Sequence, residues 1–308
     1  PAATLEAITH WYGPRRVGFL GRGVPTEPVL KDITLSFSSH SVNAILGLNG
    51  AGKSTLLKIL SGVMAPKAGA VMLEDRPIKP GHRSVKKAIG LAIGTRSRLI
   101  WDLPPIETFR LHRAIYAIDA GNFGRTMAEV EEIFAIRDFI FRPTRSLSLG
   151  QRVRVEVALA MIHRPRLLLL DECSIGLDLM AKEAYHAAIS HIAKDWGTCV
   201  VQATNDLADI RAGIAKIAIL AHNRIVFDGS FRDLTTVPGF SRTATVECDE
   251  AEVGPLVARL SAHGIAAEPD RNGALRIRAD GLEDLNACVL DCVRESAPSV
   301  RSIRFGTE

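Results

Sequence analysis

The chain has 308 residues, of which 47% are hydrophobic and 23% are charged, and its formal net charge is +4. This composition is that of a globular protein, and the length suits one large and one small domain. The small excess of positive charge comes without a dense lysine and arginine tract, so no nucleic acid is expected as the main partner. No apolar run reaches the roughly 18–20 residues that span a bilayer, and residues 1–6 lack the pattern of a secretory signal. The odd number of cysteines, five, is typical of reduced thiols in a cytosolic protein.

Strand and helix patterns alternate through the first three quarters of the chain. Apolar–polar alternation predicts a strand over 29–37, and a second strand over 41–46 leads through the glycine-rich stretch 47–52 into a helix over 53–60. Further strands are predicted at 70–73, 88–93, 167–170, 199–203, 215–220 and 224–227. Helices are predicted at about 105–118, 126–138, 150–163 and 180–195. This alternation indicates an α/β domain with a mainly parallel sheet.

The pattern breaks at residues 235–241, which we interpret as a linker. Beyond it the sequence predicts a strand over 242–248, a helix over 252–263, a hairpin over 265–278 with its turn at Asn272-Gly273, a helix over 282–295 and a strand over 300–305. This β-α-β-β-α-β order is that of the ferredoxin-like α+β fold. The predicted domains are therefore 1–236, with a helical insert over about 95–150, and a small accessory or regulatory domain over 241–308.

Residues 47–54 fit the pattern G-x-x-x-x-G-K-[ST] between a predicted strand and a predicted helix. Glycines let backbone N–H groups approach phosphate oxygens, and the start of the helix directs further unpaired N–H groups at the same anion. The Lys53 ammonium can reach the β- and γ-phosphates, and the Ser54 hydroxyl can bind Mg²⁺. The nucleotide contacts predicted in this phosphate loop are Gly47, Asn49, Gly50, Ala51, Gly52, Lys53, Ser54 and Thr55.

An apolar strand ends in two carboxylates at Asp171-Glu172. A fully apolar strand belongs in the centre of a covered parallel sheet, and ligands bind at the carboxyl ends of such strands. Asp171 can hold Mg²⁺ together with Ser54, and Glu172 can orient and deprotonate the attacking water. Combined with the phosphate loop, this strand predicts a nucleoside triphosphatase.

The segment Leu147-Ser148-Leu149-Gly150-Gln151 opens a predicted helix ahead of this strand. It resembles the signature motif of ABC-type ATPases, and Gly176-Leu177-Asp178 resembles their D-loop. The likeness runs from residue 1 to about 235 in the order of the family's motifs. Residues 98–104 and the Leu-Ser-Leu-Gly-Gln-Arg form of the signature resemble the branch of ABC-2-type exporters of drugs and polysaccharides.

The resemblance implies an ATP-binding and hydrolysing subunit, with a P-loop fold, an antiparallel β subdomain and a helical insert. Two nucleotide domains would pack head to tail, so that Ser148 and the Gly150 N–H contact the γ-phosphate of the opposite site, near Gln151 and Asp178. Tyr12 is our candidate for stacking on adenine, with Trp11 as its rival; a surface aromatic packed on the sheet is the other interpretation. The cofactors would be ATP and Mg²⁺. The protein would be cytoplasmic and attached to the inner face of the membrane through a multi-span partner.

Three positions depart from the family pattern. Thr95 stands where a Gln usually reaches the metal and the attacking water, and threonine is too short to do so. Asn205 replaces the switch His, so it can donate a hydrogen bond but cannot carry a positive charge or shuttle a proton. Cys173 replaces a Pro after the Asp-Glu pair. We therefore hypothesise that this site binds ATP and turns it over slowly. The second nucleotide subunit of the dimer is either an identical chain or a different chain that has the usual Gln and His.

Several features remain open to two interpretations. Cys288 and Cys292 share one helix face, which suits core packing or a metal. Residues 100–111 resemble the part of the family that lines the groove for the membrane subunit, and Trp101 and Phe109, expected to be exposed there, would suit such a socket. The other interpretation is local packing within the helical insert. Competing functions are an ABC-type protein acting on ribosomes or DNA, which would carry two nucleotide domains or a long coiled coil, and a P-loop kinase, which would need no signature helix.

Overall fold

The computed structural model describes residues 2–13, 27–78, 81–206, 209–210, 213–235, 242–248, 250–262, 265–269, 275–279 and 300–307. The chain divides into two compact units. One comprises Pro1–Asn205 and Ala218–Asp228, and the other comprises Asp206–Ile217 and Gly229–Glu308. The predicted linker lies almost wholly outside the described residues, so the predicted domain boundary stays a prediction.

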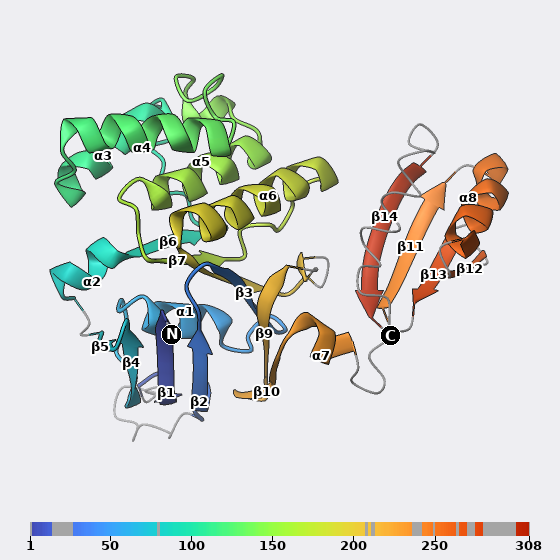
Figure 1. The fold of residues 1–308 in the computed structure, drawn as a ribbon, viewed down its shortest axis with the longest axis horizontal. Coiled ribbons are helices and arrows are strands. Elements are labelled where there is room, and N and C mark those ends of the chain that lie inside the picture. Colours follow the sequence, from blue (N-terminus) through green and yellow to red (C-terminus); the bar gives the residue numbers. More distant parts are fainter. Residues whose placement is uncertain are drawn as a thin grey trace, which may run out of the picture. The chain divides into compact units, whose positions relative to one another are not determined.

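A four-stranded antiparallel sheet of order β2-β1-β4-β5 forms one layer (Figure 1). Its strands are β1 (Ala3–His10), β2 (Leu30–Phe37), β4 (Ala68–Leu73) and β5 (Arg76–Pro77). The sequence did not predict β1, because its apolar residues do not keep a strict period of two. Ala7 has a φ of 49° and the register with β2 shifts between Leu5 and Ile8, so an irregularity in the strand resets the inward-facing side.

The second layer is a six-stranded sheet of order β10-β9-β3-β8-β7-β6. Its strands are β3 (Ser41–Leu46), β6 (Ile89–Ile93), β7 (Leu167–Asp171), β8 (Cys199–Thr204), β9 (Ile214–Ala221) and β10 (Arg224–Gly229). The neighbours β3 and β8, β8 and β7, and β7 and β6 pair in parallel. All five residues of β7 are buried, as expected for a central strand covered on both faces. The predicted α/β class with a mainly parallel sheet is confirmed.

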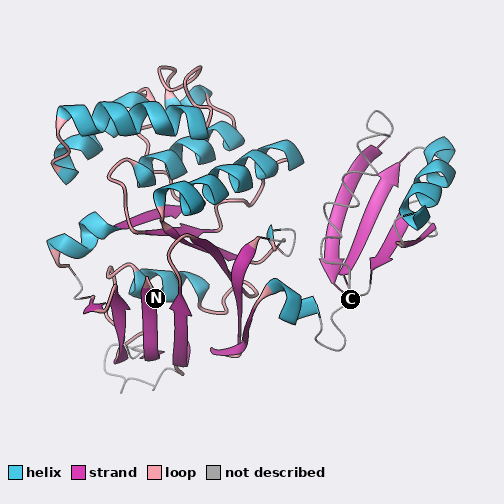
Figure 2. Cartoon of the chain, viewed as in Figure 1, coloured by secondary structure: helices cyan, strands magenta, loops and turns pink. Residues whose placement is uncertain are grey.

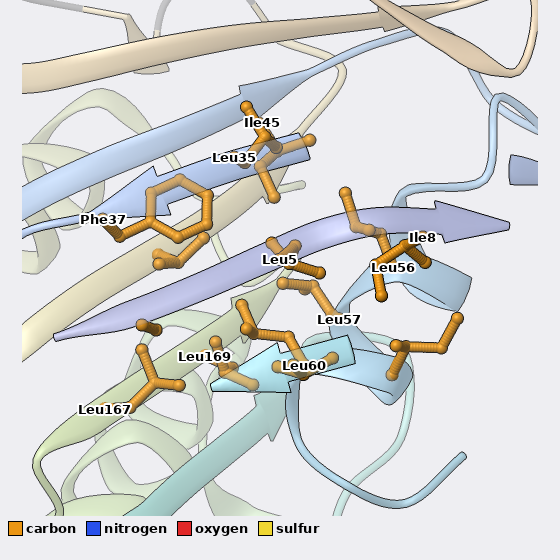
Figure 3. Close-up of a cluster of buried hydrophobic side chains, with 14 of the residues drawn as sticks. Leu5, Ile8, Leu35, Phe37, Ile45, Leu56, Leu57, Leu60, Leu167 and Leu169 are labelled. Carbon is orange, nitrogen blue, oxygen red and sulfur yellow. The ribbon is translucent and has the colours of Figure 1, made fainter. Parts of the chain in front are cut away.

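Helix α1 (Lys53–Leu60) packs between the two sheets. Figure 3 shows its leucines meeting apolar side chains from both layers, and all of the residues drawn are buried. The labelled members are Leu5, Ile8, Leu35, Phe37, Ile45, Leu56, Leu57, Leu60, Leu167 and Leu169. Burial of such side chains contributes about 1.5–3 kcal/mol each, so this core holds the start of α1 firmly against the end of β3.

The remaining helices of this unit cover the face of the six-stranded sheet that lies away from α1 (Figures 1 and 2). They are α3 (Pro105–Tyr116), α4 (Ala120–Ile133), α5 (Leu149–Met161) and α6 (Leu179–Trp196), with a 3-10 turn at Thr144–Ser146. Helix α2 (Arg83–Ala88) precedes β6. No helix in the described part of the chain is both long and apolar enough to cross a membrane.

Two predictions in the helical insert were wrong. The helix predicted at 126–138 begins at Ala120, because the Asp119 side chain accepts from the Asn122 N–H and caps it, and it is over before Ala135, whose φ is 47°. Phe109, predicted to be exposed, is fully buried on the inner face of α3. Outside the insert, His10 at the end of β1 is also buried.

The second unit contains α7 (Phe231–Thr235), β11 (Arg242–Cys248), α8 (Glu250–Ala262), β12 (Ala266–Pro269), β13 (Leu275–Ala279) and β14 (Val300–Thr307). Its strands form an antiparallel sheet of order β12-β13-β11-β14. Leu256 and Leu260 of α8 are buried, as are Val246, Leu275 and Ile277 of the sheet. The described elements match the first four elements and the last strand of the predicted ferredoxin-like order. The helix at 282–295, the turn at 272–273 and Cys288 and Cys292 lie outside the described residues, so the complete order stays a prediction.

Candidate nucleotide-binding site

The phosphate loop joins the end of β3 to the start of α1 and curls around one ammonium group. Lys53 Nζ donates to the carbonyl oxygens of Gly47 at 2.9 Å and Leu48 at 3.3 Å, and the residue is only 4% exposed. Gly50 and Gly52 have φ values of 83° and 109°, which favour glycine and turn the loop onto the helix. The loop and the helix start therefore present backbone N–H groups where an anion can bind.

The first glycine of the loop serves packing. A Cβ on Gly47 would lie 2.6 Å from the Leu220 carbonyl oxygen of β9, so no larger residue fits. The Gly47 N–H donates to the Thr204 carbonyl of β8 at 3.3 Å. The loop is thus held at the carboxyl end of the parallel sheet, where the sequence placed it.

Two carboxylates at the end of β7 face the phosphate loop. Ser54 Oγ donates to Asp171 Oδ1 at 3.1 Å, and Lys53 Nζ lies 3.3 Å from Glu172 Oε1. Burial raises the pKa of the Asp171 carboxyl, and the neighbouring Glu172 carboxylate raises it further, although the Ser54 hydroxyl opposes this. A hydroxyl and a carboxylate oxygen side by side suit a hard divalent cation such as Mg²⁺, whose charge would offset the cost of burying this carboxylate.

The backbone around Glu172 is constrained. Its φ is 54°, a left-handed value that is unfavourable for a residue other than glycine. Its N–H donates to the Ala203 carbonyl at 2.9 Å. Gly94, after β6, passes so close that a Cβ there would lie 2.2 Å from the Glu172 carbonyl oxygen. Neighbouring strands thus fix the orientation of the predicted catalytic carboxylate.

The three positions that depart from the family pattern have different surroundings. Asn205 Nδ2 donates to Asn49 Oδ1 at 2.8 Å, which places its amide beside the phosphate loop. Thr95 is exposed and lines a cavity of about 250 Å³ with Gly94, Leu149 and Cys173, among others. Thr95 is therefore one wall of a space in which a longer side chain would fit. Burial raises the pKa of the Cys173 thiol to about 12, so this group stays protonated.

Tyr12 lies beside the start of α1. Its hydroxyl is 2.9 Å from Thr55 Oγ1, and its ring meets that of His10 edge-on at 5.3 Å. Tyr12 is 45% exposed and Trp11 is 38% exposed, so both have an open ring face. The hydrogen bond to Thr55 ties Tyr12, and not its rival, to the phosphate-loop helix.

The signature segment is built as a helix start. Ser148 Oγ accepts from the Gln151 N–H at 3.2 Å while Gln151 Oε1 accepts from the Ser148 N–H at 3.0 Å, which forms a capping box at α5. Asp178 caps α6 in the same way through the Ala181 N–H at 2.8 Å. Leu149 packs on Gly176, whose φ is 76°.

The structure brings one group of predicted residues together and leaves another apart. The first group is joined in pairs by side-chain contacts: Tyr12 with Thr55, Ser54 with Asp171, Lys53 with Glu172, and Asn49 with Asn205. Among the described residues, the side-chain hydrogen bonds of Ser148 and Asp178 serve their own helices. Helix α5 covers the opposite face of the sheet from α1 (Figure 1).

One buried charged residue near the site was missed from the sequence. Glu156 lies in the middle of α5, is 7% exposed and binds the loop that follows Thr95. The available signal was a lone carboxylate in the apolar run Val153–Met161 of a predicted helix. Its partners lie more than 50 residues earlier in the chain, so spacing did not point to them.

A family model described as "ABC transporter" matches residues 30–174. A putative ABC transporter ATP-binding protein of Methanosarcina acetivorans is 32% identical over 221 residues, or 69% of this chain and 75% of the relative. The daunorubicin resistance ATP-binding protein DrrA3 of Streptomyces coeruleorubidus is 26% identical over 94% of this chain and 87% of its own length. A methionine import ATP-binding protein, MetN of Bradyrhizobium diazoefficiens, is 27% identical over 83% of this chain and 75% of its own length.

Solved structures share the fold. The structure described as the ATP-binding subunit of an ABC transporter superposes with a TM-score of 0.65 at 23% identity, covering 76% of this chain and 92% of that one. The relatives in sequence and the shared fold are therefore consistent with the order of motifs along the first unit.

Proposed function

Because this chain belongs to the family of ABC transporter ATP-binding proteins and is an ATPase of that family, we propose that it powers export through a separate membrane-spanning partner, as in ABC-2-type exporters. The observation that carries the ATPase part of the proposal is the Lys53 ammonium, held between the phosphate-loop carbonyls and Glu172. That arrangement combines an anion-binding loop with a carboxylate that can act on a water molecule.

Each residue of the site has a defined task in ATP hydrolysis. Lys53 binds the β- and γ-phosphate oxygens, and Glu172 orients the attacking water and accepts its proton. Ser54 and Asp171 would hold Mg²⁺, which when bound neutralises charge developing on the phosphates. Tyr12 stacks on adenine. Asn205, already bonded to Asn49, donates to the γ-phosphate.

The signature segment acts on a second subunit. The exposed start of α5 offers the Ser148 hydroxyl and the Gly150 N–H. Gln151 orders the start of α5, and Asp178 orders the start of α6. These donors suit the γ-phosphate bound by the phosphate loop of another nucleotide subunit. ATP binding then closes the dimer, hydrolysis reopens it, and the membrane subunit moves with it at the inner face of the membrane.

Export is favoured by the daunorubicin resistance protein, because that alignment covers 94% of this chain, including most of the second unit. The methionine import protein supports uptake as a second candidate. Inside-out membrane vesicles that hold the complex distinguish the two. ATP-dependent accumulation of a test drug inside them supports export, and dependence on an external binding protein for uptake by whole cells supports import.

The proposed ATPase role is tested by pulling down the transporter complex through this chain and comparing wild type with Glu172→Gln. Loss of nearly all ATP hydrolysis means that this chain supplies the catalytic carboxylate, despite Thr95 and Asn205. Persistence of most activity means that this site binds ATP and that a different nucleotide subunit hydrolyses it. A wild-type complex without ATPase activity contradicts the proposal.

A further inference from the structure

Glu156 is a charged residue in an apolar part of α5. It is 7% exposed, and its helical neighbours Val153, Val155 and Val157 are buried. An ionised carboxylate in such surroundings is unfavourable unless it is paired and hydrogen-bonded. The Glu156 carboxylate therefore needs hydrogen-bond donors and a cation close to it.

Those partners come from the loop after β6, which folds over the carboxylate. Glu156 Oε1 accepts from Ser97 Oγ at 2.5 Å, from the Arg98 N–H at 2.8 Å and from the Leu99 N–H at 3.3 Å. The Arg98 guanidinium adds an ion pair to Oε2 at 3.6 Å and a hydrogen bond to the Glu156 carbonyl at 3.2 Å. Three consecutive loop residues are thus fastened to one side chain of α5.

Both ends of this connection reach functional groups. Upstream, the Gly94 N–H donates to the Asp171 carbonyl at 2.8 Å, and Gly94 abuts the backbone of Glu172. Downstream, α5 begins at the signature residue Ser148. The later part of the loop is also tied to the segment before the signature, because the Arg145 N–H donates to the Trp101 carbonyl at 3.0 Å.

We propose that Glu156 is a positioning residue, which clamps the loop 97–99 to α5 so that movement at Asp171 and Glu172 is transmitted to Ser148. This inference rests on the proposed function and adds to it a link within one chain, between its own ATP site and the signature that it offers to a second subunit. The link matters here because Thr95 is too short to bridge from the loop to a bound nucleotide. Glu156 acts through the two elements that it joins, α5 and the loop 97–99.

The test compares the purified transporter complex carrying wild type, Glu156→Ala, Glu156→Gln or Ser97→Ala. Two quantities are measured: the affinity of the full chain for a fluorescent ATP analogue, and kcat and KM of the complex for ATP. We expect Glu156→Ala to lower kcat roughly tenfold while the affinity changes less than about twofold, since coupling mutations act on this scale. Glu156→Gln should restore part of kcat, because its amide oxygen still accepts from Ser97 and Arg98.

Glu107→Ala is the matched control, since it removes an exposed glutamate–arginine pair from α3, with Arg110 Nη1 at 2.7 Å, and should leave kcat unchanged. If Glu156→Ala does not fold, Ser97→Ala removes one bond of the clamp and should lower kcat about two- to threefold. Unchanged kcat in the folded clamp variants, or a parallel loss of ATP affinity, overturns the inference. An inactive wild-type complex instead contradicts the proposed function itself.

Discussion

Gly94 lies where the loop after β6 passes beneath the candidate catalytic carboxylate. A Cβ at this position would meet the Glu172 carbonyl oxygen at 2.2 Å and Cys173 Cα at 3.0 Å, and both are backbone atoms that cannot swing away. The requirement for glycine is thus steric.

We predict that Gly94→Ala lowers the free energy of unfolding by about 1–3 kcal/mol, the usual cost of overpacking, and reduces ATP hydrolysis by displacing Glu172. Urea unfolding followed by circular dichroism measures the first effect. Gly124→Ala is the control, because nothing lies within 4 Å of its added Cβ in α4 and an alanine there favours the helix. Equal stabilities of the two variants would contradict this account.

Asn205 sets the expected speed of the site. Its amide donates to Asn49, but it cannot take a positive charge as the usual histidine can. Removal of a whole donor typically costs about 2.7–4 kcal/mol of transition-state stabilisation, and loss of its charge alone should cost less. We predict that Asn205→His raises kcat of the complex at least about tenfold with little change in ATP affinity. Wild-type turnover as fast as that of Asn205→His would refute the hypothesis of a slow site.

At the scale of elements, the helical insert contains a stack of rings between α3 and the end of α5. Tyr116 and His163 are stacked at 4.0 Å with an interplanar angle of 8°, and His112 lies 5.7 Å from Tyr116. Burial is the main cause that lowers the pKa of both histidines to about 4. The charge of Arg98 lowers the pKa of His112 further. At His163 the hydrogen bond to the Ile89 carbonyl raises the pKa, while His112 and Arg98 lower it. The folded protein therefore holds both rings neutral.

This ring stack makes stability pH-dependent. The unfolded chain binds protons at these histidines below about pH 6.5, whereas the folded chain does so only near pH 4, so stability falls as the pH drops between these values. We expect His163 to account for about 1 kcal/mol of the loss in unfolding free energy between pH 7.5 and 5.5. His163→Phe keeps the ring stack without the titration, so the loss should shrink in urea melts at the two pH values. An identical pH dependence in both proteins would exclude His163 as the cause.

The boundaries of elements show the limits of pattern reading. Helix α1 and strand β11 have the predicted bounds. The glycine-rich loop marks the start of α1, and the break in the pattern at residues 235–241 marks the start of β11. Strand β1 was missed because the left-handed Ala7 interrupts its alternation. Helix α4 was placed too late, because its cap at Asp119 precedes two glycines that look like loop residues.

At the scale of the whole molecule, no helix in the described part of the chain could cross a membrane, and the proposed export role requires a membrane-spanning partner. Exposed apolar side chains gather in the helical insert, among them Trp101 at 54% exposure, while Phe109 belongs to the core. We predict that Trp101→Ala lowers the fraction of the chain recovered with membranes severalfold when the membrane subunit is co-expressed, without changing ATP binding. Val226→Ala, an equally exposed apolar position on β10, should have no effect. Full recovery of Trp101→Ala with the membranes would exclude this side chain from the attachment surface.

The sequence by itself determined the residues of the phosphate loop and the two carboxylates after β7, since short-range spacing between a strand and a helix encodes both. It also predicted the α/β class, because alternating strand and helix patterns permit few arrangements. Only the tertiary structure decided the rest. The bond between Asn49 and Asn205 joins positions 156 residues apart, and the Glu156 clamp joins α5 to a loop 57–59 residues earlier. Such contacts depend on how the layers pack, and no local pattern records which buried charge will meet which loop.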